Sequence, residues 1–221
     1  TESRRNAVIT EVKAASPSRG TIKTDFDPAE IARAMENGGA TGISVLTEPK
    51  HFNGSLSYLV GVRKAVRLPI LMKDIIIDQI QLEAASRIGA NVVLLIEALF
   101  EREYCELSLD EMIKQAHSRR LEVMLETHNE DEFQRVIETD ADLVGINNRD
   151  LRTLNVDLHI TERILRKNKN KGKVVVSESG VMTAADLLFL RRCGAQAFLI
   201  GSSVMMADNI EQKVKEFVIA H

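Results

Sequence analysis

Short runs of apolar and β-branched residues alternate with amphipathic helical patterns along the chain, and this alternation is the strongest constraint on its fold. Eight runs of strand length begin about 27 residues apart on average. We predict strands over residues 7–13, 42–48, 69–75, 91–99, 122–128, 143–150, 173–180 and 197–203. We predict helices over residues 28–37, 55–66, 78–88, 109–120, 129–138, 156–166, 183–193 and 210–220.

Strands that alternate with helices form right-handed crossovers and a parallel sheet, which places the chain in the α/β class. Eight such units in 221 residues fit a closed (β/α)8 TIM barrel or an open, doubly wound sheet. The dinucleotide-binding pattern G-x-G-x-x-G follows none of the predicted strands, which weakens the open sheet. No linker or change of composition divides the sequence, so we predict that residues 1–221 form a single barrel domain.

The composition argues against several classes of protein. Lys and Arg (29) nearly balance Asp and Glu (32), which leaves no broad positive surface for nucleic acid. No apolar run approaches the ~18 residues of a membrane span, and no secretion signal opens the chain. The five His and two Cys show no metal-ligand spacing. We therefore expect a cytoplasmic protein that binds no metal, membrane or nucleic acid.

Polar and ionisable residues follow the apolar part of most predicted strands. In a TIM barrel the carboxyl ends of the strands converge on the face that carries active sites. One charged residue there is equally well explained by a structural ion pair, but so many at one level indicate a functional site. These residues are Glu11, Lys13, Lys73, Asp74, Glu126, His128, Asn147, Asn148, Arg149, Ser177, Glu178 and Ser179.

Both signs of charge occur in this set. A lysine among carboxylates stays protonated and can donate a proton, whereas a carboxylate beside a lysine stays ionised and can accept one. Lys13 and Lys73 share the predicted face with several glutamates. The sequence therefore predicts general acid–base chemistry.

The last two predicted strands end in loops suited to an anion. Ser177-Glu-Ser-Gly180 and Gly201-Ser-Ser203 contain glycines that let backbone N–H groups approach a ligand, and a short helical stretch comes next at 204–206. Loops after strands seven and eight are the common phosphate site of TIM barrels, although plain turn glycines have the same appearance in a sequence. The loop over 14–26 belongs to the same face and is a candidate lid.

The motifs that contain these residues resemble those of the indole-3-glycerol phosphate synthase family over nearly the whole chain. They fall in order at the ends of seven strands or just beyond them. The motifs are Glu11-Val-Lys13 with Ser16-Pro-Ser18, Ile43-Ser-Val-Leu-Thr-Glu48, Phe52-Asn-Gly-Ser55, Pro69-Ile-Leu-Met-Lys-Asp74, Leu94-Leu-Ile96, Gly145-Ile-Asn-Asn-Arg-Asp150, Ser177-Glu-Ser-Gly180 and Gly201-Ser202.

The resemblance implies a lyase of tryptophan biosynthesis that needs no cofactor. Its substrate would be 1-(o-carboxyphenylamino)-1-deoxyribulose 5-phosphate, which closes to indole-3-glycerol phosphate with loss of CO2 and water. By resemblance, Lys73 is the general acid and Glu126 the general base of the dehydration, while Lys13 binds the substrate carboxylate and Glu11 holds the lysines. The other implied site residues are Asn147 and Glu178 for substrate hydroxyls or developing charge, and Ser16, Phe52, Arg149, Ser179, Gly180, Gly201 and Ser202 for the substrate and its phosphate.

The chain departs from the family pattern at a few places. Ile75 stands where the family usually has Phe, and Glu97 where it tends to have an apolar or small residue. The family has a segment before the first strand, and because this chain begins six residues before that strand we expect the segment to be missing. Two alternatives therefore stay open: an impaired or non-catalytic phosphate-ligand-binding barrel, and another phosphosugar enzyme such as phosphoribosylanthranilate isomerase. We expect a monomer or a weak homo-oligomer.

Overall fold

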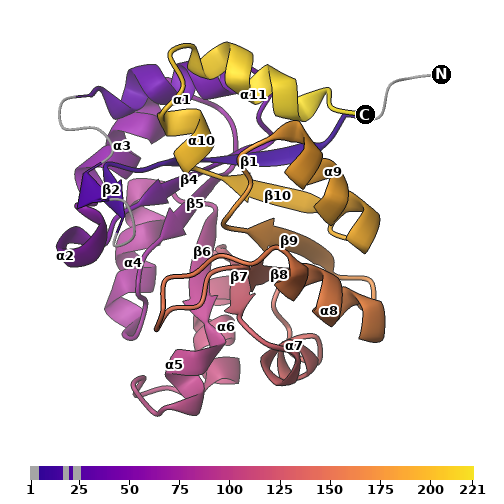
Figure 1. Cartoon of the computed structure of the whole chain (residues 1–221). Coiled ribbons are helices and arrows are strands. Elements are labelled where there is room, and N and C mark those ends of the chain that lie inside the picture. Colours follow the sequence, from indigo (N-terminus) through magenta and orange to yellow (C-terminus); the bar gives the residue numbers. More distant parts are fainter. Residues whose placement is uncertain (1–4, 17–19, 22–25) are drawn as a thin grey trace.

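The computed structural model describes residues 5–16, 20–21 and 26–221, except the side chains of Ser16 and Thr21, and forms a closed barrel (Figure 1). Within these residues eight strands pair in parallel, and the first pairs with both the second and the last. In order around the barrel they are β1 (Ala7–Val12), β4 (Gly42–Leu46), β5 (Ile70–Lys73), β6 (Val92–Ile96), β7 (Glu122–Thr127), β8 (Leu143–Asn147), β9 (Val174–Glu178) and β10 (Ala197–Ile200). The predicted (β/α)8 barrel is confirmed.

Helices cover the outside of the barrel (Figure 1). The helices between and after the barrel strands include α1 (Pro28–Asn37), α3 (Leu56–Ala65), α4 (Gln79–Ile88), α6 (Leu109–Ser118), α7 (Glu130–Val136), α8 (His159–Lys167), α9 (Ala184–Cys193) and α11 (Ile210–Val218). Side-chain oxygens of Asp27, Asp78 and Thr183 accept backbone N–H groups in the first turns of α1, α4 and α9, as N-caps do. Among the described residues, no helix has the length and apolar character that crossing a membrane requires.

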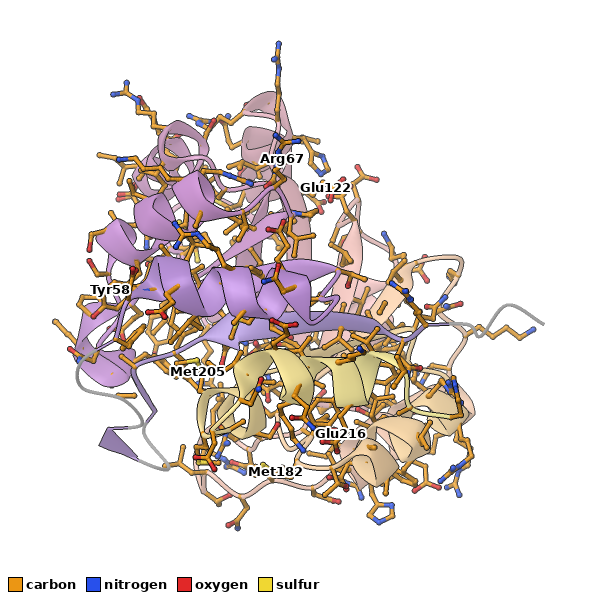
Figure 2. The ribbon with its side chains drawn as sticks, turned by 90° about the horizontal axis from the view of Figure 1, so that it is seen from above. Tyr58, Arg67, Glu122, Met182, Met205 and Glu216 are labelled. Atoms are coloured by element: carbon orange, nitrogen blue, oxygen red, sulfur yellow. The ribbon has the colours of Figure 1, made fainter. Side chains whose placement is uncertain are left out.

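The first strand and the last helix are joined at the barrel wall. Helix α11 lies beside α1 in both views (Figures 1 and 2). Asn6 precedes β1 and donates its backbone N–H to Val218 O at 2.9 Å and its amide to Phe217 O at 2.9 Å. Arg191 of α9 donates to Asn6 Oδ1 at 2.9 Å. These hydrogen bonds close the ring of helices where the pairing of β1 with β10 closes the ring of strands.

The interior of the barrel is apolar toward the amino ends of the strands and charged toward their carboxyl ends. Alternate residues of a strand face the same side, so Ile9 and Glu11 share the inner face, as do Leu71 and Lys73. The inner apolar residues form a core separate from the larger one between strands and helices. This inner core consists of Leu71, Val92, Leu94, Met124, Val176, Ala197 and Leu199. It forms the floor beneath the charged residues at the carboxyl ends of the strands.

The strand predicted over 91–99 is wrong at its end. Strand β6 stops at Ile96, and Glu97 begins the short helix α5 (Glu97–Glu101). The Glu97 carboxylate is buried against Arg135 of α7, whose Nε lies 2.6 Å from Glu97 Oε1. The run 97–99 therefore folds as a helix, and its charged residue is paired with a residue of a neighbouring helix.

The predicted elements on either side of residue 150 are also too long. Strand β8 stops at Asn147 instead of reaching Asp150, and the helix predicted from residue 156 begins at His159. Between them Arg149 and Val156 form an antiparallel β-bridge. The chain between these two residues is therefore a loop folded back on itself, at the end of the barrel that carries the site.

Short elements lie at the same end, and the sequence patterns did not predict most of them. The two-stranded antiparallel sheet of β2 (Ala15–Ser16) and β3 (Gly20–Thr21) comes after β1, and α2 (Pro49–Phe52) comes after β4. Strand β2 and helix α2 contact each other and are found at the left of Figure 1. Helix α10 (Ser202–Met205) comes after β10 and begins two residues before the helical stretch predicted at 204–206.

Asn148 links the ends of β8 and β9 from a fully buried position. Its amide nitrogen donates to Ser177 Oγ at 3.0 Å and to Glu178 O at 2.9 Å, and its oxygen accepts from Thr161 Oγ1 at 2.8 Å. Because Asn148→Ala removes these three buried hydrogen bonds at once, we expect the free energy of unfolding in urea to fall by about 3 kcal/mol. The exposed Asn37→Ala is the control, with an expected change below about 0.5 kcal/mol. Equal, small effects of both changes would contradict this role.

Candidate active site

Lys73 stands at the centre of a charged layer at the carboxyl end of β5. Its Nζ lies 2.6 Å from Glu178 Oε2, 3.6 Å from Glu126 Oε2 and 3.9 Å from Glu11 Oε2. These glutamates belong to β9, β7 and β1 and are all buried. The barrel therefore places one ammonium group against three carboxylates that are far apart in the sequence.

Lys13 supplies a second ammonium group to this layer, since its Nζ lies 2.8 Å from Glu11 Oε1. Burial disfavours the Glu11 carboxylate, but Lys13 and Lys73 outweigh burial and lower the pKa of Glu11. Burial also disfavours the Lys73 ammonium, but the three carboxylates, above all that of Glu178, outweigh it and raise the pKa of Lys73. Lys73 is therefore protonated at neutral pH and available as a proton donor.

Glu126 and Glu178 ionise differently, because partners outweigh burial at Glu126 and do not at Glu178. Burial disfavours the charge on Glu126, but Lys73, His128 and Asn147 outweigh it and lower the pKa of Glu126 to about 2. Glu178 is fully buried beside the negative Glu126, and despite its contact with Lys73 burial raises the pKa of Glu178 to about 7. Glu126 is thus an ionised carboxylate at neutral pH, suited to accept a proton, while Glu178 titrates near neutrality.

A cavity of about 340 Å³ opens over this layer at the carboxyl ends of the strands. Its charged and amide lining residues include Glu11, Lys13, Lys73, Glu126 and Asn147. Its apolar lining residues are Leu46, Phe52, Ile75, Leu94, Ile96, Leu151, Leu154, Val156, Val181, Met182, Leu199 and Ile200. Apolar walls with a few convergent polar groups are typical of a site for a small organic ligand.

The loops after β8, β9 and β10 form a polar rim of the cavity. Ser179 (φ 64°) and Gly180 (φ 91°) are both in the left-handed region, which turns the chain sharply beside the cavity. Gly201 comes after β10, Ser202 begins α10, and Arg149 comes after β8. All five residues line the cavity. A guanidinium, hydroxyls and glycine-containing backbone turns are the groups that bind phosphate in proteins.

The structure gathers most of the predicted site residues around one cavity. They are Glu11, Lys13, Lys73, Glu126, Asn147, Phe52, Arg149, Ser179, Gly180, Gly201 and Ser202. Glu178 belongs to the same cluster, but it is fully buried and contacts Lys73 without lining the cavity. Ser16 lies in β2, and its side chain and the predicted lid residues 17–19 and 22–25 lie outside the described part of the chain.

Two further residues help to build the site: His128, which the sequence predicts among the strand-end residues but without a role, and Glu48, which is missing from the predicted site residues. His128 contacts Glu126 (Nε2 to Oε1, 3.1 Å) and Glu132 (Nδ1 to Oε2, 3.3 Å). Glu48 accepts backbone N–H groups of α2, including that of Phe52 at 3.2 Å, and so fixes the helix that carries this lining residue. Both come directly after apolar strand runs, which is a signal of a site, but their partners become evident only in three dimensions.

Three carboxylates beside the barrel, those of Glu97, Glu101 and Glu132, have oxygens within 4.8 Å of one another. Arg135 already pairs with two of them, with Nε 2.6 Å from Glu97 Oε1 and Nη2 3.3 Å from Glu101 Oε1. The guanidinium supplies positive charge to the cluster, so we assign no metal to it.

Comparisons with known proteins point to one family. The sequence profile of indole-3-glycerol phosphate synthase matches residues 1–217. The indole-3-glycerol phosphate synthase of Methanocaldococcus jannaschii is 45% identical, over 97% of this chain and 79% of its own length. Those of Neisseria meningitidis serogroup C and Caldanaerobacter subterraneus subsp. tengcongensis are 47% and 42% identical, over 94% and 96% of this chain and 78% and 80% of their own lengths.

A solved structure of a differently named protein has the same fold. Thiamine phosphate pyrophosphorylase from Pyrococcus furiosus has a TM-score of 0.69 at 16% identity, with 98% of this chain and 96% of that chain covered. At this identity the likeness shows the barrel fold alone. The sequence matches extend over nearly the whole chain at much higher identity. The chain belongs to the indole-3-glycerol phosphate synthase family.

Proposed function

We propose that this chain is an indole-3-glycerol phosphate synthase, which closes the pyrrole ring of 1-(o-carboxyphenylamino)-1-deoxyribulose 5-phosphate with loss of CO2 and water in tryptophan biosynthesis. The observation that carries the proposal is the single layer in which the Lys73 ammonium lies 3.6 Å from the ionised Glu126, on the cavity with the polar rim. Family membership supports the same reaction and does not favour an isomerase or a non-catalytic barrel.

The cavity has a polar, apolar or charged group to bind each part of the substrate. The phosphate suits the rim with Arg149, Gly180 and Gly201, and the aromatic ring suits the apolar lining that includes Phe52. The carboxylate on that ring suits the ammonium group of Lys13. Because the phosphate is remote from the reacting carbons, its binding energy serves to hold those carbons next to Lys73.

Ring closure requires a proton donor, and Lys73 has that role. The aromatic carbon that bears the carboxylate attacks the ketone carbon, and the electrons of the carbonyl bond move to its oxygen, which takes a proton from Lys73. The bond to the carboxylate then breaks, CO2 leaves, and its electron pair restores the aromatic ring. The proton consumed in this step returns to Lys73 from solvent.

Dehydration requires a proton acceptor, and Glu126 has that role. The new hydroxyl takes a proton and leaves as water while the nitrogen lone pair stabilises the cation. Glu126 removes a proton from the neighbouring methylene carbon, and the electrons of that C–H bond form the double bond of the indole. One proton is taken up and one released, so this step is balanced. Asn147, which donates to Glu126 Oε1 at 3.1 Å, keeps the carboxylate in place.

The proposed activity is tested by incubating the purified chain with the substrate and following indole fluorescence. We expect time-dependent product that scales with the concentration of the chain. Lys73→Ala, expressed and purified in parallel from a host without its own synthase, controls for contaminating activity. A fluorescence signal no greater than that of the variant, at high concentration of the chain and with phosphate ligand bound, would favour a non-catalytic barrel instead.

Gly201 offers a further test, because it has no room for a side chain. A Cβ atom there would lie 2.5 Å from Glu11 Oε1 and 3.0 Å from Lys13 Nζ. Gly201→Ala displaces this ion pair, so we expect kcat/KM to fall at least about tenfold in the fluorescence assay. Gly61→Ala, in α3 with open space around its Cβ position, is the matched control and should leave kcat/KM unchanged. Equal kcat/KM for both variants would show that the Glu11–Lys13 pair is not critical.

A further inference from the structure

His128 lies between two buried carboxylates at the end of β7. Its Nε2 is 3.1 Å from Glu126 Oε1 and its Nδ1 is 3.3 Å from Glu132 Oε2. Only 14% of the His128 side chain is exposed. An imidazole with a carboxylate at each nitrogen is most stable with both nitrogens protonated, because a neutral ring leaves one nitrogen lone pair against an anion.

The second carboxylate, that of Glu132, is fixed independently of the ring. The backbone N–H of His128 donates to Glu132 Oε2 at 2.7 Å, and Asn129 Nδ2 donates to Glu132 Oε1 at 2.6 Å. The Glu132 N–H in turn donates to Asn129 Oδ1 at 2.9 Å, which caps α7. These hydrogen bonds hold the Glu132 carboxylate in place at Nδ1 of the His128 ring, while Glu126 lies at Nε2.

The two oxygens of Glu126 have different neighbours. Oε1 accepts from Asn147 Nδ2 at 3.1 Å and lies 3.1 Å from His128 Nε2. Oε2 lies 3.6 Å from Lys73 Nζ. One oxygen is thus held by the protein, and the other is on the side of the proposed proton donor.

Glu126 shares the Lys73 ammonium with other carboxylates, so a second cation beside it helps to keep it ionised. The Lys73 ammonium is closest to Glu178, at 2.6 Å, and Glu11 has its own partner in Lys13. Burial opposes a charge on His128, but Glu126 and Glu132 outweigh it and raise the pKa of His128 to about 10.

The neighbouring helices bring three more charged side chains near this group. Glu97 and Glu101 of α5 each have a carboxylate oxygen within 4.8 Å of one of Glu132, and both are paired with Arg135 of α7, at 2.6 and 3.3 Å. Arg135 offsets only part of their negative charge, so this cluster does not oppose a cationic His128, and the carboxylates in contact with the ring are those of Glu126 and Glu132.

We infer that His128 is a positioning residue for the proposed reaction: its imidazolium, supported by Glu132, holds Glu126 Oε1 so that Oε2 is presented to the substrate beside Lys73. His128 contacts Glu126 and is not among the described residues that line the cavity, so it acts through Glu126. The kinetic part of this inference rests on the proposed function, whereas the charge and contacts of His128 do not depend on it.

The charge is tested by nitrogen-15 NMR of the full chain, with His128 assigned by the loss of its signals in His128→Gln. We expect both ring nitrogens to stay protonated from pH 6 to above pH 8. A ring that is neutral at pH 7.5 would overturn the inference whether or not the chain is an active synthase.

The positioning role is tested by steady-state kinetics of two variants. We expect His128→Gln, which is neutral, to lower kcat about tenfold with KM changed less than about threefold, and to move the acidic limb of the kcat profile to higher pH. His128→Lys restores a cation and should recover part of the lost kcat. His117→Gln removes a histidine paired with Asp142 outside the site and should match the wild type.

These experiments distinguish a failure of the inference about His128 from a failure of the proposed function. A His128→Gln variant with kcat and pH profile like those of the wild type would overturn the inference, and so would equal losses in the Gln and Lys variants. An inactive wild-type chain would refute the proposed function instead, and the NMR titration would then decide the charge of His128 and with it the inference.

Discussion

Lys73→Ala is expected to lower kcat by about 10²-fold or more while binding of phosphate ligands survives. The ammonium gives its proton to the carbonyl oxygen in ring closure, whereas the rim loops after β8, β9 and β10 do not depend on it. Fluorescence of the indole product measures kcat, and calorimetry with indole-3-glycerol phosphate measures binding.

The exposed Lys64 of α3 provides the matched control, because Lys64→Ala removes the same charge far from the cluster. We expect this variant to keep the wild-type kcat. An unchanged kcat in Lys73→Ala would remove Lys73 from the role of general acid. Joint loss of kcat and of ligand binding would mean that Lys73 mainly holds the barrel end together against its three carboxylates.

Glu126→Gln is expected to lower indole formation by about 10²–10⁴-fold, because the amide keeps the shape of the carboxylate but accepts no proton. Ring closure and loss of CO2 precede the step that needs this base. In a single turnover with labelled carboxylate, we therefore expect CO2 to be released well before indole appears.

The order of these two signals separates the two proposed roles. Lys73→Ala should delay CO2 and indole together, since it blocks the first step. Glu83→Gln, on the exposed face of α4, should match the wild type in both signals. If Glu126→Gln delays CO2 release as much as indole formation, Glu126 acts before the dehydration and the assignment is wrong.

The barrel could be predicted because its strands are nearly continuous apolar runs, as strands buried on both faces must be. The run Val92–Ile96 is an example, and it forms β6 with those limits. The structure of the next three residues could not be predicted from local pattern. Glu97-Ala98-Leu99 suits a strand or a helix, and the ion pair of Glu97 with Arg135, a long-range contact, accompanies the helix.

Most of the short elements around the cavity escaped prediction for a related reason. Helix α2 has only four residues, too few to be stable by itself. Its first turn exists because the Glu48 carboxylate accepts the backbone N–H groups of Lys50, His51 and Phe52. Such capping depends on where β4 ends, and the sequence does not specify that position sharply.

The level of the charged residues in the barrel could be predicted from strand alternation, but their pairing could not. Alternation places Glu11 and Lys73 on inner faces near the carboxyl ends of their strands. Which glutamate lies nearest to Lys73 depends on the stagger between strands, and the structure shows it to be Glu178 at 2.6 Å, with Glu126 at 3.6 Å. The contact of His128 with Glu132 likewise depends on how α7 begins.

A crystal structure of the chain with bound indole-3-glycerol phosphate tests the central claim most directly. We predict the phosphate at the backbone of Gly180 and Gly201, and the indole ring in the cavity within reach of both Lys73 Nζ and Glu126 Oε2. A phosphate bound away from these glycines, or an indole ring that reaches only one of the two catalytic groups, would contradict the account.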